Sequence, residues 1–358
     1  MKVVQINAVD SILSTGRTSK ELAEYLIKKG IECRVYVGDC KLREPYDYCI
    51  GNNFDHKVHA LLSRITGLQG YFSHIATRKL ISDLKKYKPD IVHLRNLHAN
   101  YVNIPMLLKY LAKNEIPTVI TLHDCYMFTG KCFYPSDINC DKWKTSCTNC
   151  KLKHTGNQSW VFDRSHKMFE DKKKYLLSNK YLAVTGVSHW ITEQAKESFF
   201  KDCAKFKEIY NWIDLKIFYP RLENSIRERY GIDTKPIVLG VATNWNQEKG
   251  LEDFVQLADD ISNKANVVLV GRISDGYDTG KVICVGLTES VNTLAEFYSE
   301  ATVFFNPSRR ETFGKVTAEA LACGCPVVVY DNTALPELVG ERCGYVVETG
   351  NLDEARGK

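Results

Sequence analysis

The sequence predicts an α/β protein made of two doubly wound domains. Short β-branched runs alternate with helical patterns along all 358 residues, which is typical of a parallel sheet covered on both faces. The alternation restarts near residue 211, at a connector that reads NWIDLKIFYP. A chain of this length is sufficient for two separate cores. We therefore expect domains at residues 1–211 and 212–358 that face one another across a cleft.

The first domain begins with a strand at residues 3–7, then a Ser/Thr/Gly turn and a helix near 18–29. A polar, Cys-rich insertion at residues 125–160 interrupts the alternation directly after a strand. Long loops in compact domains are usually functional or tied down. The other elements expected here are strands at 32–37, 91–94, 118–122 and 182–187 and a helix at 100–113.

The second domain repeats the same order of elements. The chain stops at NLDEARGK, where a final helix begins, so we expect this domain to be shortened at its C-terminus. Ligands of doubly wound sheets bind at the carboxyl ends of the strands, so the loops after strands are the candidate sites. The expected elements are strands at 237–241, 267–270, 283–285, 302–306 and 327–330, and helices at 251–263, 293–299 and from 314 onward.

Composition restricts the possible partners. The net charge of +5 suits an anionic small ligand or an anionic membrane surface, and no basic stripe with interleaved aromatics predicts nucleic-acid binding. No apolar run approaches the roughly 20 residues that span a bilayer. MKVVQINAVD is interpreted as a first strand and not as a signal peptide. We expect a cytoplasmic protein whose thirteen cysteines stay reduced.

Two carboxylates accompany the helix expected from Gly314. Glu311 lies just before it, and Glu319 lies more than one turn inside it. The first-turn amides of a helix bind phosphate, whereas carboxylates accept hydrogen bonds from hydroxyl groups. A sugar nucleotide supplies both kinds of group, so the pair indicates a sugar-nucleotide site.

These residues also resemble a known family. ETFGKVTAEALACGCPVV, with its Glu-x7-Glu spacing, resembles the signature of retaining glycosyltransferases with the two-Rossmann-domain fold called GT-B, of the family 4-like, group 1 type. NWIDLKIFYP, VATNWNQEKGLEDF and TLHD are similar to the family's interdomain segment, phosphate-binding loop and N-domain histidine motif. The resemblance extends over nearly the whole chain.

The resemblance implies roles for the residues around the start of the helix expected from Gly314. Glu311 would contact the donor sugar, and Glu319 would bind the ribose. The backbone amides of Thr312, Phe313 and Gly314 would hold sugar and phosphate oxygens.

Lys249 matches the family's pyrophosphate lysine, which stabilises the departing nucleoside diphosphate. The family usually has an arginine five residues earlier, where this chain has Asn244; Arg272 or Arg310 could supply that contact.

The resemblance also assigns residues of the first domain. His123, at the end of a strand, would contact the donor sugar. STGR at 14–17 resembles a loop that approaches the diphosphate or the acceptor; Gly16 would permit close approach, and Arg17 would face phosphate or only solvent. Asn96 and His98 would face the acceptor or instead cap and pack a helix.

The insertion holds four candidate metal ligands. Cys132, Cys140, Cys147 and Cys150 lie in one loop, and the last two form C-x-x-C, so the pattern predicts a structural zinc site. Unpaired thiols, or disulfides formed on oxidation, are the alternative. Four thiolates would leave no open coordination position, and the resemblance implies that no catalytic metal is needed because Lys249 and the helix amides replace it.

We thus expect a retaining glycosyltransferase that moves a sugar from a UDP- or GDP-sugar to a glycan or lipid-linked acceptor in surface polysaccharide biosynthesis. The alternatives are a sugar-nucleotide epimerase and a non-catalytic nucleotide-sugar-binding module. The basic run at 164–180 is a solvated helix face or a weak dock for anionic lipid, which would place the protein at the inner membrane face.

Overall fold

The computed structural model of the chain describes residues 1–10, 13–41, 44–202, 204–222 and 225–358. It divides into two compact units, Met1–Tyr210 (unit 1) and Asn211–Lys358 (unit 2), each with its own sheet. Within these described ranges, no helix is both long and apolar enough to cross a membrane.

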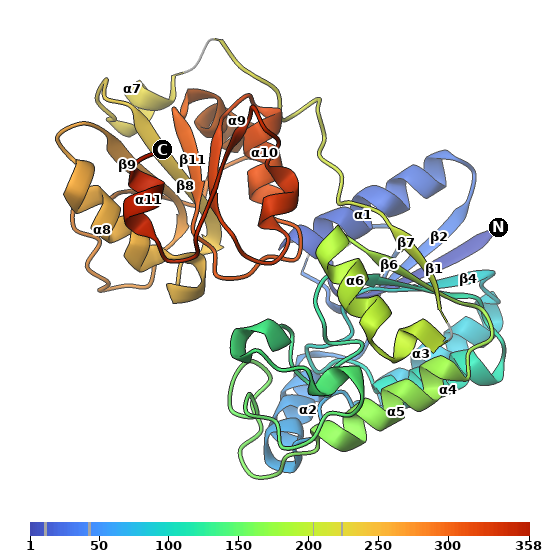
Figure 1. The fold of residues 1–358 in the computed structure, drawn as a ribbon. Helices are drawn as coiled ribbons and strands as arrows, with labels where there is room; N and C mark the ends of the chain where they lie inside the picture. Colours follow the sequence, from blue (N-terminus) through green and yellow to red (C-terminus); the bar gives the residue numbers. More distant parts are fainter. Residues whose placement is uncertain (11–12, 42–43, 203, 223–224) are drawn as a thin grey trace. The chain divides into compact units, whose positions relative to one another are not determined.

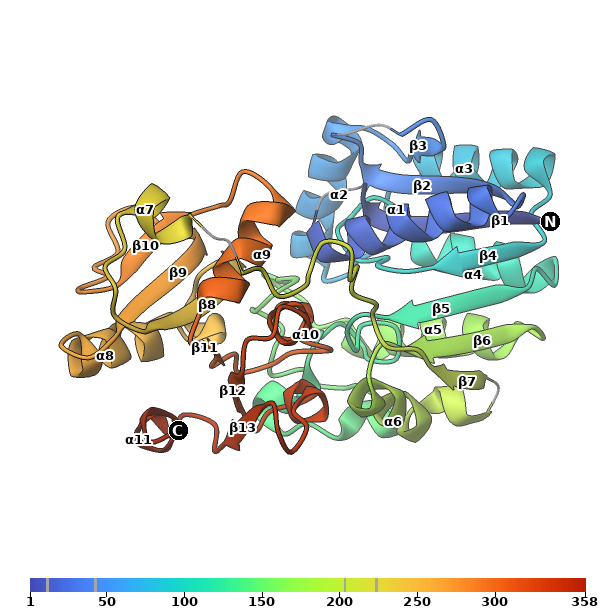
Figure 2. The same cartoon turned by 90° about the horizontal axis from the view of Figure 1, so that it is seen from above.

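Unit 1 contains a seven-stranded sheet in the order β3-β2-β1-β4-β5-β6-β7, in which every pairing is parallel (Figure 2). The strands are β1 (Lys2–Val9), β2 (Glu32–Asp39), β3 (Asp47–Cys49), β4 (Ile91–Leu94), β5 (Thr118–Leu122), β6 (Leu182–Gly186) and β7 (Lys205–Glu208).

Helices cover both faces of this sheet. Figure 1 shows α3, α4 and α5 along one face and α1 along the other. The α-helices are α1 (Leu13–Lys28), α2 (Asn53–Thr66), α3 (His74–Tyr87), α4 (Ile104–Lys113), α5 (Ser165–Leu177) and α6 (His189–Glu197). The short 3₁₀ helices are η1 (Pro135–Ile138), η2 (Lys142–Lys144) and η3 (Phe199–Asp202), the first two lying in the Cys-rich insertion.

Unit 2 contains a six-stranded parallel sheet in the order β10-β9-β8-β11-β12-β13. The strands are β8 (Ile237–Asn244), β9 (Asn266–Arg272), β10 (Ile283–Gly286), β11 (Val303–Asn306), β12 (Val327–Tyr330) and β13 (Gly344–Val347). The helices are α7 (Ile226–Tyr230), α8 (Leu251–Ile261), α9 (Val291–Glu300), α10 (Lys315–Ala322) and α11 (Leu352–Arg356), with 3₁₀ helices η4 (Gln247–Lys249) and η5 (Leu335–Leu338).

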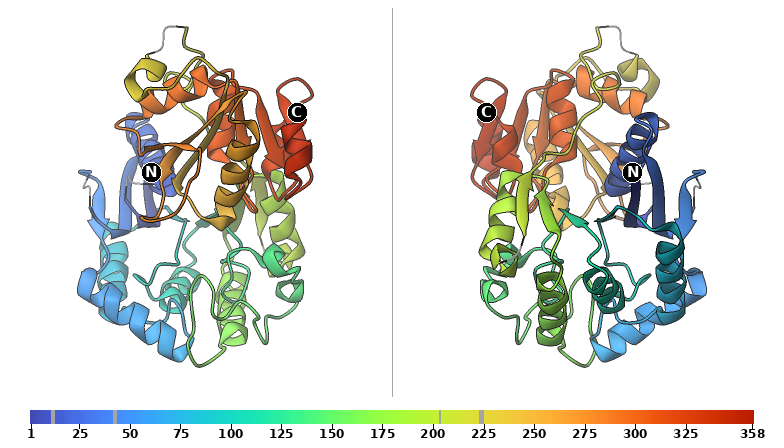
Figure 3. Two further views of the ribbon diagram at one scale, coloured as in Figure 1. Left: turned by 90° about the vertical axis from the view of Figure 1, so that its left-hand side faces the viewer. Right: turned by 90° about the vertical axis from the view of Figure 1, so that its right-hand side faces the viewer.

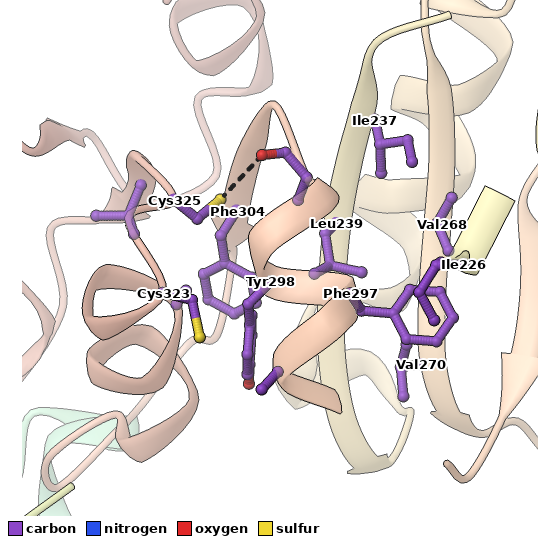
Figure 4. Packing of buried hydrophobic residues seen from close by; sticks show 14 of the residues in the cluster. Ile226, Ile237, Leu239, Val268, Val270, Phe297, Tyr298, Phe304, Cys323 and Cys325 are labelled. Carbon is purple, nitrogen blue, oxygen red and sulfur yellow. Dashed lines mark hydrogen bonds between the residues drawn. The ribbon is translucent and has the colours of Figure 1, made fainter. Parts of the chain in front are cut away.

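The alternation of side chains along β8 divides the core of unit 2 into two layers. Ile237 and Leu239 pack on one face with Phe297 of α9, as Figure 4 shows, whereas Val238 packs on the other face with Phe254 of α8. Both faces are therefore buried, which is the burial expected of a parallel sheet. The α/β class with two doubly wound sheets is confirmed.

One pair of cysteines differs from the expectation of reduced thiols. Cys40 and Cys49 form a disulfide, with their Cα atoms 6.0 Å apart. The parallel pairing of β2 with β3 brings the two residues within the distance that a disulfide requires.

Candidate active site

The strand order of unit 2 reverses at β8, because β9 lies on one side of it and β11 on the other. Loops that follow the strands at such a reversal separate and leave room for a ligand. The loop after β8 carries Lys249, and the loop after β11 carries Glu311. The sheet topology thus brings the two main predicted site residues to one place.

These two loops are joined by direct contacts. The amide of Arg309 donates to the carbonyl of Glu248 at 2.8 Å. Gly250 has φ +73° and packs so closely on Pro307 that a Cβ there would lie 2.5 Å from its ring. The side chain of Asn246 accepts a hydrogen bond from the amide of Lys249 at 3.0 Å. Lys249 is therefore held on a fixed turn.

Lys249 and Glu311 form an ion pair between Nζ and Oε1. The same oxygen accepts from the hydroxyl of Ser308 at 3.2 Å, and the amide of Glu311 donates to Thr333 at 2.8 Å. The lysine side chain is 35% exposed and the glutamate side chain 17% exposed. An incoming phosphate could take over the lysine, which would release the carboxylate to accept hydrogen bonds from hydroxyl groups.

The start of α10 depends on a glycine. Gly314 has φ +83°, and a Cβ there would lie 2.7 Å from Leu335. The helix begins one residue later, so its positive end lies in the same loop as Glu311. Thr312 and Phe313, predicted to contribute backbone amides, have buried side chains that anchor this loop. The predicted order of strand, loop and helix is confirmed here.

Glu319 lies on the inner side of α10. It is only 1% exposed, and its Oε2 accepts from the hydroxyl of Tyr298 at 3.3 Å. Its predicted contact with ribose stays a prediction.

Asn244 and Arg272 lie opposite each other at the ends of β8 and β9. Both line a hollow of about 610 Å³, together with Trp245. The structure thus groups Asn244 with Arg272 in the lining of this hollow. Arg310 instead forms an ion pair with Glu248.

In unit 1 the strand order reverses between β1 and β4, and a buried arginine occupies that point. Arg95 follows β4 directly and is 3% exposed. Its Nη2 donates to the hydroxyl of Thr18 in α1 at 2.5 Å and contacts Nε2 of His123, after β5, at 3.1 Å. A guanidinium can only donate, so Nε2 of His123 accepts and the ring proton lies on Nδ1.

The sequence analysis missed Arg95. Burial lowers its pKa to about 10, and its Nε has no hydrogen-bond partner within the described part of the chain. A charged residue immediately after a buried strand was the signal that could have identified it. His123 does follow its strand as predicted, and Arg95 contacts Nε2 of its ring.

The placement predicted for STGR was wrong. Gly16 and Arg17 lie in the first turns of α1, which begins at Leu13, and not in a loop. Helical hydrogen bonding and packing of α1 on β1 and β2 outweigh the turn preference of a Ser/Thr/Gly run. Whether a ligand approaches the backbone at Gly16 closely, and whether Arg17 faces phosphate, stay predictions.

The two candidate acceptor residues lie in the loop after β4. Nε2 of His98 pairs with Asp124 at 2.9 Å, and the amide of Asn96 donates to the side chain of Asn7 at 3.3 Å. These contacts fit the capping and packing alternative, although they leave a role in acceptor binding open to test.

The four insertion cysteines surround one hollow of about 170 Å³. Burial raises the pKa of Cys132 to about 12 and that of Cys147 to about 11. Cys147 Sγ accepts from the amide of Gly130 at 3.1 Å. In the ranges that the structure describes, no three His, Cys, Asp or Glu side chains are grouped so as to hold a metal ion, and the zinc site stays a prediction.

Comparison with known proteins shows that two family models match the chain. Residues 15–217 match Glycosyltransferase Family 4, and residues 235–356 match Glycosyl transferases group 1. A relative, N-acetyl-alpha-D-glucosaminyl L-malate synthase of Bacillus anthracis, is 26% identical over 47% of this chain and 46% of its own length. The putative colanic acid biosynthesis glycosyl transferase WcaC of Escherichia coli is 23% identical over 72% and 64%. The chain thus spans about half to two thirds of these relatives.

Solved structures share the fold over the whole chain. Sucrose-phosphate synthase from Thermosynechococcus elongatus superposes with a TM-score of 0.69 at 18% identity and is covered to 88%. WaaG, a glycosyltransferase involved in lipopolysaccharide biosynthesis, gives 0.67 at 14% identity and is covered to 89%. Anabaena Alr3699/HepE in complex with UDP gives 0.65 at 14% identity and is covered to 88%. The chain belongs to glycosyltransferase family 4, of the group 1 type, and its two Rossmann-like units are those of the GT-B fold.

Proposed function

We propose that this chain transfers a sugar from a UDP- or GDP-sugar to a hydroxyl of a glycan or lipid-linked acceptor, with retention of the anomeric configuration. The observation that carries the proposal is the Lys249–Glu311 ion pair between two joined loops at the strand reversal of unit 2. Family membership supports it, as do a relative named for colanic acid biosynthesis and solved neighbours named as complexes with UDP and UDP-glucose.

In this proposal each side chain of the site has a separate role in the reaction. The bond from the sugar C1 to the diphosphate breaks, and Lys249 with the positive end of α10 stabilises the charge on the leaving group. The acceptor oxygen bonds to C1 on the same face, and the leaving phosphate takes its proton. Glu311 holds sugar hydroxyls, Glu319 the ribose, Arg272 a phosphate oxygen, and His123 positions the sugar. The proposal includes the expected cytoplasmic location.

Donor binding and product analysis test the proposal. Titration with UDP-glucose and GDP-mannose is expected to show tight binding of one donor, weakened in Glu311→Ala and Lys249→Ala but not in Lys264→Ala, an exposed lysine of the same unit. An epimerase would convert the donor without an acceptor, and a binding module would leave it intact. Either result would contradict the transferase assignment.

We also propose that the insertion cysteines take up zinc after their side chains rearrange. The proposal is supported by the shared hollow of the four thiols and by the N–H···S hydrogen bond on Cys147. Because burial raises the thiol pKa values, zinc would have to displace protons, and uptake should weaken at acidic pH. Metal analysis of the purified chain is expected to find one zinc, lost in Cys147→Ser with Cys150→Ser; zinc-free protein would contradict this.

A further inference from the structure

Helix α2 presents its apolar side to solvent. Phe54, Val58, Leu61 and Ile65 recur at helical spacing and are all exposed, Phe54 to 77%. The buried residues of the same helix are polar, namely His59 and Ser63. This is the reverse of the usual arrangement for a helix that covers a sheet.

A polar network holds α2 in this orientation. Nδ1 of His59 contacts the hydroxyl of Ser73 at 2.8 Å, and that hydroxyl donates to Asp55 Oδ2 at 2.5 Å. Nε2 of His59 accepts from the amide of Phe72 at 3.4 Å, which leaves Nδ1 as the donor to Ser73. Rotating α2 to bury its apolar side would break these bonds. The outward apolar side is thus built into unit 1.

Neighbouring segments extend this apolar side into one surface. Ile75 of α3, 69% exposed, lines a hollow of about 470 Å³ together with Phe54 and Val58. At the other end of α2, the amide of Trp160 donates to the carbonyl of Arg64 at 2.7 Å, so the exposed run 160–162 (Trp-Val-Phe) adjoins the helix. We call α2, Ile75 and residues 160–162 the α2 surface; Figure 3 shows α2, in light blue, along the outer edge of unit 1.

Exposed Lys and Arg side chains flank the apolar residues of the α2 surface. Within residues 53–66, 74–87 and 160–167, the acidic residues Asp55, Asp83 and Asp163 are only partly exposed. Asp55 is engaged by Ser73, and Asp163 accepts from the amides of Cys150 and Ser165. The exposed cations flanking the apolar residues include Lys57, Arg64, Arg78, Lys79 and Arg164.

We propose that the α2 surface docks this protein on an anionic lipid bilayer, with the apolar stripe and Trp160 inserted at the interface and the cations against lipid headgroups. Aromatic and apolar side chains ringed by Lys and Arg are typical of interfacial helices. A protein partner is disfavoured because the cores of protein interfaces are depleted of lysine. Of the basic run at 164–180, Arg164 adjoins this surface, whereas Lys172 is buried and Lys167 pairs with Asp171.

Vesicle flotation of the full chain tests the proposal. Binding to phosphatidylcholine vesicles that contain phosphatidylglycerol is expected, with little binding to phosphatidylcholine alone and less binding at high salt. Phe54→Ser with Leu61→Ser should lower the partition coefficient at least about tenfold, and Lys79→Gln about fivefold. Leu215→Ser and Lys264→Gln, at exposed positions of unit 2, are the matched controls and should bind like the wild type.

Thermal melts followed by circular dichroism establish that the variants are folded, and Lys79→Gln gives an independent result because it leaves the apolar stripe intact. Wild-type protein that does not float with anionic vesicles, or α2-surface variants that float like the wild type, would overturn the proposal. Self-association that Phe54→Ser abolishes, without vesicle binding, would show a contact between copies and would equally overturn it. No donor or acceptor enters the assay, so the outcome is independent of the proposed transfer reaction.

Discussion

The two points of strand reversal, one in each unit, carry charge in different ways. In unit 2 the partly exposed Lys249 is neutralised by Glu311. In unit 1 the buried Arg95 has a hydroxyl and an imidazole as its hydrogen-bond partners and an unpartnered Nε. We therefore expect the unit 2 site to exchange one partner for an anion, and the unit 1 site to hold its cation in place and orient other groups.

The strongest test of this difference removes the exchangeable cation. Lys249→Met should lower kcat for transfer by about 10²–10³-fold, because the leaving diphosphate loses a charge that is placed close to it. Stability should change little, since the lysine side chain is 35% exposed. Lys264→Met is the control in a steady-state transfer assay. Equal rates for the two variants would contradict the assignment of Lys249.

The matching change in unit 1 is Arg95→Met. We expect transfer to fall about tenfold or more, because His123 loses the donor that fixes its tautomer. The free energy of unfolding should not fall in parallel, since a buried cation with an unpartnered nitrogen is costly to fold. Kinetics and urea unfolding of Arg95→Met and of Lys109→Met, an exposed control in the same unit, distinguish the two effects. A parallel loss of stability and activity would show that Arg95 is only structural.

The backbone of the unit 2 site can be tested through its glycine. Gly314→Ala should cost about 2 kcal/mol of stability, because alanine is strained at φ +83° and its Cβ meets Leu335. Gly340→Ala, where φ is unstrained and the nearest atom is 3.6 Å away, should be nearly neutral. Urea unfolding measures both variants, and equal midpoints would contradict the argument.

The smallest expected effect concerns acid stability of unit 1. Burial lowers the pKa of His93 to about 3, with a smaller contribution from Arg95. Between that pKa and the ordinary value of about 6.5, the unfolded chain binds a proton that the folded chain excludes, so stability falls as the pH drops below about 6.5. His93→Gln should therefore lose about 1 kcal/mol less than the wild type between pH 6.5 and 5.5. His166→Gln, an exposed control, should follow the wild type.

Much of this arrangement was predictable from sequence, because parallel strands are short β-branched runs. Residues 118–122 and 327–330 form strands with the predicted bounds. The helix predicted from residue 100 begins at Ile104, where the side chain of Asn103 caps the amide of Met106. The loop that carries Glu311 was indicated by its flanking strand and helix, whereas Lys249 and His123 were assigned through the resemblance to the family.

The rest depends on contacts that sequence spacing does not reveal. Arg95 gains its role from Thr18 and His123, which are distant along the chain. The apolar residues of α2 have the spacing of a buried face, and the network of His59 and Ser73 helps to hold them outward. Likewise, the Cys40–Cys49 bond requires the register of two strands.

The hydrogen bond from Arg309 to Glu248 and the packing of Gly250 on Pro307 have a practical consequence for engineering. Grafting only the β8 loop or only the β11 loop from a relative would leave each new loop against a mismatched neighbour. Donor preference should therefore be exchanged by transplanting both loops together, as a single cassette.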